Sequence, residues 1–169
     1  MNLIVRPAVI GDAAAIAEIY NIEVEGAETN YASQRETVES RAGWISGLKE
    51  KGFPVLVAED VEGQVVGFGA LTPFHPLAGY RFTVTGSLYV HANCRGKGVG
   101  KILAESLLKA AKKRDVHSII AGINSNNEAS IQLHRSMGFQ QVGHFKEIGF
   151  KNGKWHDDLC FQLILPKSS

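Results

Sequence analysis

Hydrophobic residues recur along the chain with two different periods, and the alternation between those periods predicts the order of the elements. Short apolar or alternating runs favour strands at 3–5, 53–59, 64–71, 80–90, 117–123, 140–148 and 155–165. Helical spacing favours helices that begin after Asp12, extend over about 36–51 and 99–113, and begin again at Asn126 or Asn127. Strands and helices therefore alternate from end to end.

Turn-forming residues separate these elements. Glu62-Gly63 and Asn152-Gly153 each lie between two strand patterns and predict hairpin turns. Two prolines and a glycine make 72–79 a loop, and the polar residues 21–34 are expected to be irregular. The pattern predicts an α/β fold in which one mixed sheet carries helices on both faces. We find no linker or repeat, so 1–169 is expected to be one domain.

Two of the helices have distinct apolar faces. The helix over 99–113 carries a regular stripe that includes Val99, Leu103 and Leu107, opposite Lys101, Glu105 and Lys109. In the helix over 36–51 the expected buried side chains are Val38, Trp44, Ile45 and Leu48.

Composition and charge exclude several classes of protein. The chain of 169 residues is 44% hydrophobic and 21% charged, as in globular domains, and its net charge of +1 gives no basic field for nucleic acid. No stretch approaches the roughly 20 apolar residues of a membrane span, and the apolar start is too short for a signal peptide. We therefore expect a cytoplasmic protein without nucleic acid or membrane partners. Cys94 and Cys160 are expected to be free thiols.

The most informative segment is a glycine-rich turn between a strand and a helix. Gly96, Gly98 and Gly100 alternate with other residues just before the helix over 99–113. Glycine allows positive φ and close approach to the main chain, and the first N–H groups of a helix have no internal partners. The turn thus predicts an anion site suited to a pyrophosphate, with added charge from Arg95, Lys97 and Lys101.

Spacing disfavours the two common nucleotide motifs. A Walker loop has four residues between its first glycine and Gly-Lys, followed by Ser or Thr, whereas three residues separate Gly96 from Gly100-Lys101 and Ile102 follows. The dinucleotide fingerprint has the spacing Gly-x-Gly-x-x-Gly, whereas these glycines are spaced Gly-x-Gly-x-Gly.

Arg95-x-x-Gly98-x-Gly100 after a Tyr-Val strand resembles the coenzyme A pyrophosphate loop of the GCN5-related N-acetyltransferase (GNAT) family. A second segment downstream, from Asn127 to Phe139, is similar to the family pattern Asn-x-x-Ala/Ser-x-x-Leu-Tyr/His-x-x-x-Gly-Phe. Segments such as Ile19-Tyr20-Asn21 and 80–83 resemble the phosphinothricin and methionine sulfoximine acetyltransferase branch. The resemblance implies a mostly antiparallel sheet of six to seven strands, acetyl-CoA as co-substrate, a small amine acceptor such as an amino acid analogue, and a homodimer.

The resemblance also assigns cofactor-binding residues. Main-chain groups of Leu88, Tyr89 and Val90 are expected to hold the pantetheine arm and to polarise the thioester carbonyl. The pyrophosphate is expected on the turn. Asn127 corresponds to a residue that binds the cofactor arm and Ser136 to one near the nucleotide end. The complete set on the turn is Arg95, Gly96, Lys97, Gly98, Val99, Gly100 and Lys101.

His134 occupies the position at which many relatives have a tyrosine that protonates the departing thiolate. An imidazole can supply a proton to a thiol whose pKa lies near 8.5. A histidine satisfied by a backbone group on a helix is the alternative interpretation.

The acceptor side departs from the branch at one position. Thr85 stands where the branch usually has a glutamate base, and threonine cannot act as a base near neutral pH. Glu28, a water relay or capture of the neutral amine could replace it. Phe74, Tyr80 and Arg81 are further acceptor-side candidates, Arg81 for a carboxylate, although each could equally be a surface, core or dimer residue.

Other functions remain open at this point. Cys94 could act as a covalent nucleophile or be an incidental loop residue. The six histidines show no zinc-type spacing, so no metal is expected. Thr85 leaves room for a catalytically weak acetyl-CoA sensor, and a protein or peptide N-acetyltransferase is a further alternative.

Overall fold

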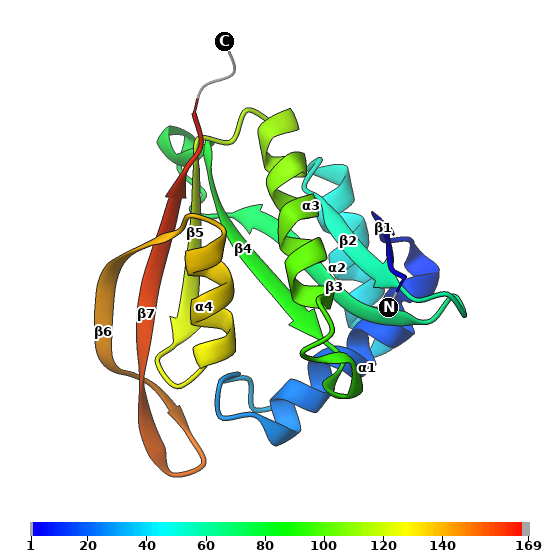
Figure 1. The fold of residues 1–169 in the computed structure, drawn as a ribbon, viewed down its shortest axis with the longest axis horizontal. Coiled ribbons are helices and arrows are strands. Elements are labelled where there is room, and N and C mark those ends of the chain that lie inside the picture. The colour runs from blue at the N-terminus through cyan, green and yellow to red at the C-terminus, as the bar shows by residue number, and fades with distance from the viewer. Residues whose placement is uncertain (1, 167–169) are drawn as a thin grey trace.

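The computed structural model describes residues 2–166, which build one seven-stranded sheet (Figure 1). The strands lie in the order β1-β2-β3-β4-β5-β7-β6. Their bounds are β1 Ile4–Pro7, β2 Val55–Glu59, β3 Val65–Pro73, β4 Thr83–Val90, β5 Ser118–Asn124, β6 Gln140–Lys151 and β7 Lys154–Ile164. Neighbouring strands are antiparallel except β4 and β5, which are parallel. The predicted mixed, mostly antiparallel α/β sheet is confirmed.

Both predicted hairpin turns are present, and their backbone angles explain their residues. Gly63 between β2 and β3 has a φ of 78°, while Asn152 and Gly153 between β6 and β7 have φ values of 53° and 75°. In the β6–β7 turn, positive φ at both central residues gives the hairpin the right-handed twist of its strands, and asparagine and glycine adopt it most readily, while in the β2–β3 turn Gly63 has a positive φ and Glu62 does not.

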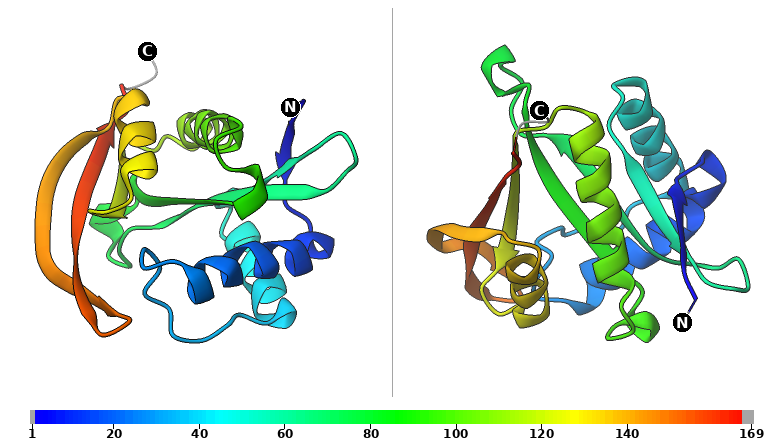
Figure 2. Two further views of the ribbon diagram at one scale, coloured as in Figure 1. Left: turned by 60° about the horizontal axis from the view of Figure 1, so that its bottom comes forward. Right: turned by 45° about the horizontal axis from the view of Figure 1, so that its top comes forward.

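Helices cover both faces of the sheet, as expected (Figure 2). The helices α1 (Ala13–Gly26) and α2 (Val38–Glu50) lie on one face, and α3 (Val99–Lys113) and α4 (Glu128–Ser136) lie on the other. Each face has its own apolar core. The core under α3 and α4 includes Val84, Leu103, Leu107, Ile119 and Phe161. The core under α1 and α2 includes Ile16, Ile19, Ile45, Val57 and Phe68.

The close approach of α3 to the sheet depends on two glycines in β3. A Cβ atom on Gly67 would lie 2.9 Å from a methyl of Val99, and one on Gly69 would lie 2.9 Å from a methyl of Leu107. These distances are shorter than van der Waals contact, so the helix can rest on β3 only because both residues lack side chains. The predicted stripe of α3 is thereby buried against β3 and β4.

Two helical predictions need correction. Residues 21–26 were expected to be irregular, but α1 continues to Gly26. Asn21 is buried there because its amide group exchanges two hydrogen bonds with the main chain of Glu36, at 2.8 and 2.9 Å. These bonds satisfy a polar side chain that would otherwise be costly to bury.

The buried face of α2 also differs from the prediction. Val38 was expected in the core, yet it lies in the first turn and is 46% exposed. Arg41 is buried instead, with its guanidinium 3.8 Å from the centre of the Tyr20 ring and 5.1 Å from that of Trp44. Stacking on aromatic faces makes this charged side chain tolerable in the interior.

One strand prediction also needs correction, because β4 begins at Thr83 rather than at residue 80.

None of the helices within 2–166 is both long enough and apolar enough to cross a membrane.

Candidate active site

A gap opens in the sheet where the parallel strands β4 and β5 separate. Residues 83–85 of β4 pair with residues 118–120 of β5, and within the described chain this ladder goes no further. Beyond it β4 continues to Val90 and β5 to Asn124, and the two carboxyl ends diverge (Figures 1 and 2). Main-chain groups along the separated part of β4 are therefore available to a ligand.

The β3–β4 ladder decides which groups of β4 face the gap. The N–H of His91 donates to Val66 O and the N–H of Phe74 donates to Thr83 O, at 2.9 and 3.3 Å. In an antiparallel ladder such pairs alternate, so the backbone of Tyr89 is turned toward β3 while that of Leu88 and Val90 is turned toward the gap. Val90 O accepts a hydrogen bond from Arg95 Nε at 3.3 Å.

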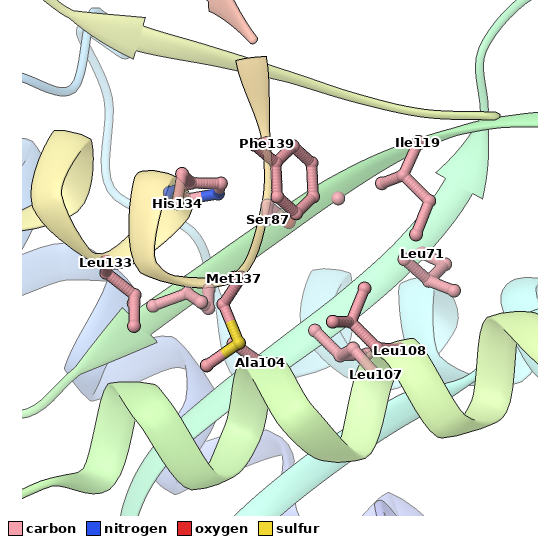
Figure 3. A pocket seen from close by; sticks show the side chains of 12 residues that line it. Leu71, Ser87, Ala104, Leu107, Leu108, Ile119, Leu133, His134, Met137 and Phe139 are labelled. Atoms are coloured by element: carbon pink, nitrogen blue, oxygen red, sulfur yellow. The ribbon is translucent and has the colours of Figure 1, made fainter. Parts of the chain in front are cut away.

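A cavity lies on the α3 and α4 side of this gap (Figure 3). Ser87 and His134 are the polar residues that line it, and its apolar wall includes Leu71, Leu107, Ile119, Met137 and Phe139. The cavity thus joins the point where β4 and β5 separate to the facing surfaces of α3 and α4. Its mostly apolar lining would strengthen any hydrogen bond made to a group inside it.

The glycine-rich turn has the geometry of an anion site. Gly96 and Gly98 have φ values of 71° and 87°, and Gly98 is the N-cap of α3 with no side chain bonded to the helix end. A Cβ on either residue would meet no atom within 4 Å, so the space above the turn is open. The N–H groups of Val99, Gly100 and Lys101 lack helical partners because they belong to the first turn of α3. The helix dipole adds positive potential at the same place.

His134 lies in α4 and lines the cavity, and one of its ring nitrogens is hydrogen-bonded within the helix. Its Nδ1 is 2.8 Å from Ser130 O, and a carbonyl oxygen can only accept, so Nδ1 carries the proton. Nε2 then carries the lone pair when the ring is neutral. Burial lowers the pKa of His134 below its usual value, although the bond to Ser130 O acts in the opposite direction. The ring packs edge-on against Phe139, 5.0 Å between centres, which fixes its orientation.

Comparison with known proteins agrees with this geometry. The family model described as an acetyltransferase (GNAT) domain matches residues 6–160. An L-methionine sulfoximine/L-methionine sulfone acetyltransferase of Pseudomonas paraeruginosa is 35% identical over 165 residues, which cover 98% of this chain and 96% of that protein. The chain belongs to the GNAT family. It is an acetyltransferase of that family, and the branch predicted from its sequence is confirmed.

Two solved structures share the fold along nearly the whole chain. The putative acetyltransferase yncA of Salmonella typhimurium, solved with its cofactor acetyl-CoA, superposes with a TM-score of 0.95 at 36% identity and covers 100% of this chain and 97% of its own. A ribosomal-protein-alanine N-acetyltransferase of Brucella melitensis has a TM-score of 0.93 at 43% identity, with 96% and 99% covered.

The basic residues of this GNAT turn differ in what they contact. Arg95 forms an ion pair with Glu23 of α1 and also bonds Val90 O, so its charge is partly neutralised within the protein. Lys97 Nζ donates to Asn93 O at 2.9 Å, and Lys101 is exposed on the first turn of α3. The turn is therefore braced by Arg95 against α1, while the two lysines remain beside the open space.

Asn127, Ser136 and Cys94 each have local contacts. Asn127 Oδ1 accepts the N–H of Ser130 at 3.1 Å and so caps α4. The hydroxyl of Ser136 donates to Leu133 O at 2.7 Å on an exposed turn. Cys94 packs half-buried against the core under α3 and is not part of the cavity lining. Burial raises the pKa of the other free thiol, Cys160.

The predicted acceptor-side residues are divided between two places. Thr85 is the last residue of β4 that pairs with β5, so it lies where the gap begins. Phe74 and Tyr80 contact each other in the exposed β3–β4 loop, 5.6 Å between ring centres. Arg81 lies in the same loop, where Nη1 donates to Ala78 O and the guanidinium covers the ring of Phe82. None of these three loop residues lines the cavity.

A polar cluster on the α1 and α2 face was not predicted from the sequence. Tyr31 donates to Asp158 Oδ1 at 2.7 Å and accepts from Asn124 Nδ2 at 2.9 Å. Asp157 and Asp158 are adjacent charges near the start of a predicted strand, and that anomaly was the available signal. Glu28, considered as a base, lies 4.0 Å from Lys154 Nζ at the surface. Across residues 2–166 no three His, Cys, Asp or Glu side chains converge as metal ligands would.

We predict that Gly98→Glu weakens the binding of acetyl-CoA by at least about tenfold. The new carboxylate would enter the anion site, and a side chain at a φ of 87° strains the turn. Isothermal titration calorimetry measures the dissociation constant. Gly153→Glu is a matched control because Gly153 also has a positive φ, 75°, and open space beyond its Cα. Equal affinity for acetyl-CoA in the Gly98 variant and the wild type would contradict the assignment of the anion site.

Proposed function

We propose that this acetyltransferase moves the acetyl group of acetyl-CoA onto the α-amine of an amino acid or amino acid analogue, such as methionine sulfoximine or phosphinothricin. The observation that carries the proposal is the continuity of the gap. It runs from the unpaired amides at the start of α3, along the gap-facing main chain of β4, to an apolar cavity beside His134. The proposal treats 1–169 as one acetyltransferase domain in the cytoplasm, where Cys94 and Cys160 remain free thiols.

We propose that acetyl-CoA lies along this path with its pyrophosphate at the turn and its thioester at the cavity. Its pyrophosphate would lie against the amides of residues 98–101, with Lys97 and Lys101 beside it. Its pantetheine arm would follow the gap-facing backbone of Leu88 and Val90 as an added strand. The thioester would then lie in the cavity next to Ser87 and His134. A main-chain N–H of β4 is positioned to stabilise the negative oxygen of the tetrahedral intermediate.

We assign His134 a proton-relay role in place of simple proton donation. The amine nitrogen attacks the carbonyl carbon, and the π electrons of the carbonyl bond move onto its oxygen. His134 Nε2 takes one proton from the resulting ammonium centre. The C–S bond then breaks, and the leaving thiolate receives that proton from Nε2. The relay needs a neutral ring at the start, which the protonated Nδ1 and the lowered pKa of His134 favour.

This relay does not require a carboxylate at position 85. A zwitterionic intermediate loses its ammonium proton far more readily than a free amine cation does, so one acceptor is enough once the amine has attacked in its neutral form. Thr85 is too weak a base to help. The sensor alternative, in which acetyl-CoA binds without transfer, is therefore not needed to explain the threonine.

A peptide N-terminus is the second candidate acceptor. The Brucella neighbour, at 43% identity, is named for alanine of a ribosomal protein, and both acceptor classes present an α-amine. They differ in the free α-carboxylate, for which Arg81 in the β3–β4 loop is the candidate partner.

We further propose that two copies associate through β6. This strand is at the edge of the sheet, and Val142, Phe145, Ile148 and Phe150 on it are each at least 52% exposed. Trp155 of β7 is 61% exposed and packs on Phe150, 5.0 Å between ring centres. An exposed apolar edge of this kind is a liability in a monomer and is typical of an interface between identical chains.

The acceptor class is tested by a panel of amines assayed for thiol release from acetyl-CoA. We predict turnover of methionine sulfoximine, phosphinothricin or free amino acids, and kcat/KM at least about tenfold lower for the corresponding amides, which lack the carboxylate. Peptides with N-terminal alanine are the comparison set. Faster turnover of the peptides would favour the second candidate, and binding of acetyl-CoA without turnover of any amine would favour the sensor.

The relay predicts that His134→Gln lowers kcat by about 100-fold while the affinity for acetyl-CoA changes little. His117→Gln, on an exposed histidine, is the control. In the wild type, activity should fall as pH drops through the lowered pKa of His134, below 6.5, because protonation removes the lone pair of Nε2. Stopped assays at a series of pH values measure this fall in activity at low pH. Activity that instead falls as pH rises through that region would show that the protonated ring is the active form.

Association through β6 predicts that Trp155→Glu halves the mass measured by light scattering, because a charge on the apolar edge opposes burial. Val61→Glu is the matched control, since Val61 is 75% exposed in the β2–β3 turn. A monomeric wild type would contradict the proposed dimer.

A further inference from the structure

The segment between α1 and α2 is tied to the β6–β7 hairpin by a set of polar contacts. Lys151 Nζ donates to Val24 O and Asn30 O, each at 2.5 Å, and lies 3.4 Å from Ala32 O. Lys151 thereby satisfies carbonyls at the end of α1 and in the following segment, where a cation is favoured. These contacts join residues 24–32 to a part of the chain about 120 positions away.

Tyr31 is the centre of this connection. Its hydroxyl donates to Asp158 on β7 and accepts from the buried Asn124 at the end of β5, two strands that pair at those residues. Its ring lies on Gly149 of β6, where a Cβ atom would overlap it. The hydroxyl remains a donor over the working pH range, because burial and the adjacent Asp158 raise the pKa of Tyr31 to about 12.

The bulge in β6 lets this packing occur. The β6–β7 register shifts between Phe145 and Gly149, and Asp157 holds the bulge by accepting the N–H of Glu147 at 2.8 Å and a hydrogen bond with His144 at 2.7 Å. The adjacent carboxylates of β7 therefore have separate contacts. Asp157 fixes the bulge, and Asp158 holds Tyr31.

The contacts of Tyr31 lie beside the gap in which the reaction is proposed to occur. In the proposed arrangement the thioester lies on the α3 and α4 side of the gap, which leaves the opposite face of the sheet for the approach of the amine. On that face the end of α1 and the following segment lie below the diverging ends of β4 and β5 (Figures 1 and 2). Asn124, at the tip of β5, forms the rim of the gap and bonds Tyr31.

We propose that Tyr31 is a positioning residue of the acceptor site, which fixes residues 27–37 as a wall against which the amine binds, through its bonds to Asp158 and Asn124. The inference rests on the proposed function. If residues 27–37 are already ordered before the acceptor binds, binding does not have to offset the entropy lost in ordering them. It also keeps the amine close to the thioester, which raises the rate of attack.

The experiment compares Tyr31→Phe, Asp158→Asn and Asp158→Leu with the wild type. Tyr31→Phe keeps the ring on Gly149 but removes the hydroxyl, and is expected to lower kcat/KM for the acceptor by about tenfold, mainly through KM. KM for acetyl-CoA should stay unchanged. Asp158→Asn retains a carbonyl oxygen that accepts from Tyr31 and should be close to wild type, whereas Asp158→Leu should behave like Tyr31→Phe.

Tyr20→Phe is the matched control, because it removes a phenolic hydroxyl from α1 on the same face of the sheet. Trypsin provides a readout that does not depend on turnover. Arg35 is exposed within the segment, and cleavage after it should become faster in Tyr31→Phe and Asp158→Leu but not in Asp158→Asn or Tyr20→Phe.

The outcomes are distinct. Acceptor kinetics unchanged in Tyr31→Phe, or KM raised equally for acceptor and acetyl-CoA, would overturn the inference and indicate a purely structural residue. A loss in Asp158→Asn as large as in Asp158→Leu would also overturn it, because the carboxylate charge rather than the position of Tyr31 would then matter. A wild type that acetylates no amine would contradict the proposed function itself, whatever trypsin shows.

Discussion

The site depends on the early end of the hydrogen-bonded ladder between β4 and β5. A parallel ladder that continued to Val90 would satisfy the backbone of Leu88 and Val90 with β5 and leave nothing for a ligand. Because it ends at Thr85, a strand in the middle of the sheet has the free main chain that is normally found only at an edge. The helix end at Gly98 lies at the far end of the same strand, so the two sets of unpaired amides form one path.

Neighbouring elements keep that path open. Because Gly67 and Gly69 have no side chains, α3 packs closely on β3, and this packing sets the distance between the start of α3 and β4. The pair Arg95–Glu23 ties the turn to α1, and Lys151 ties the end of α1 to the β6–β7 hairpin. The proposed cofactor side and the proposed acceptor side of the gap are thus connected through the last turn of α1, although they lie on opposite faces of the sheet.

Much of the fold could be predicted from local sequence. The bounds of α3 were predicted correctly because a regular stripe follows a glycine turn, and Asn152-Gly153 identified the last hairpin. Long-range contacts account for the errors. Only the fold reveals that Glu36 satisfies Asn21 and lets α1 continue, or that Tyr20 and Trp44 bury Arg41 in place of Val38. The gap itself has no local signal, because it arises where the pairing of β4 with β5 ends at Thr85 and Ile120, and the residues of either strand taken alone do not show that end. The cluster around Tyr31 joins positions more than 90 residues apart and could not be assembled from spacing.

The central claim is that unpaired amides at the start of α3 and along β4 bind acetyl-CoA. The most direct measurement is a titration of the isotopically labelled protein with coenzyme A, followed through its amide ¹H–¹⁵N resonances. The account predicts the largest downfield proton shifts at Gly98, Val99 and Gly100, with further shifts at Leu88 and Val90. Unchanged resonances at those residues in a protein that nonetheless binds coenzyme A would contradict it.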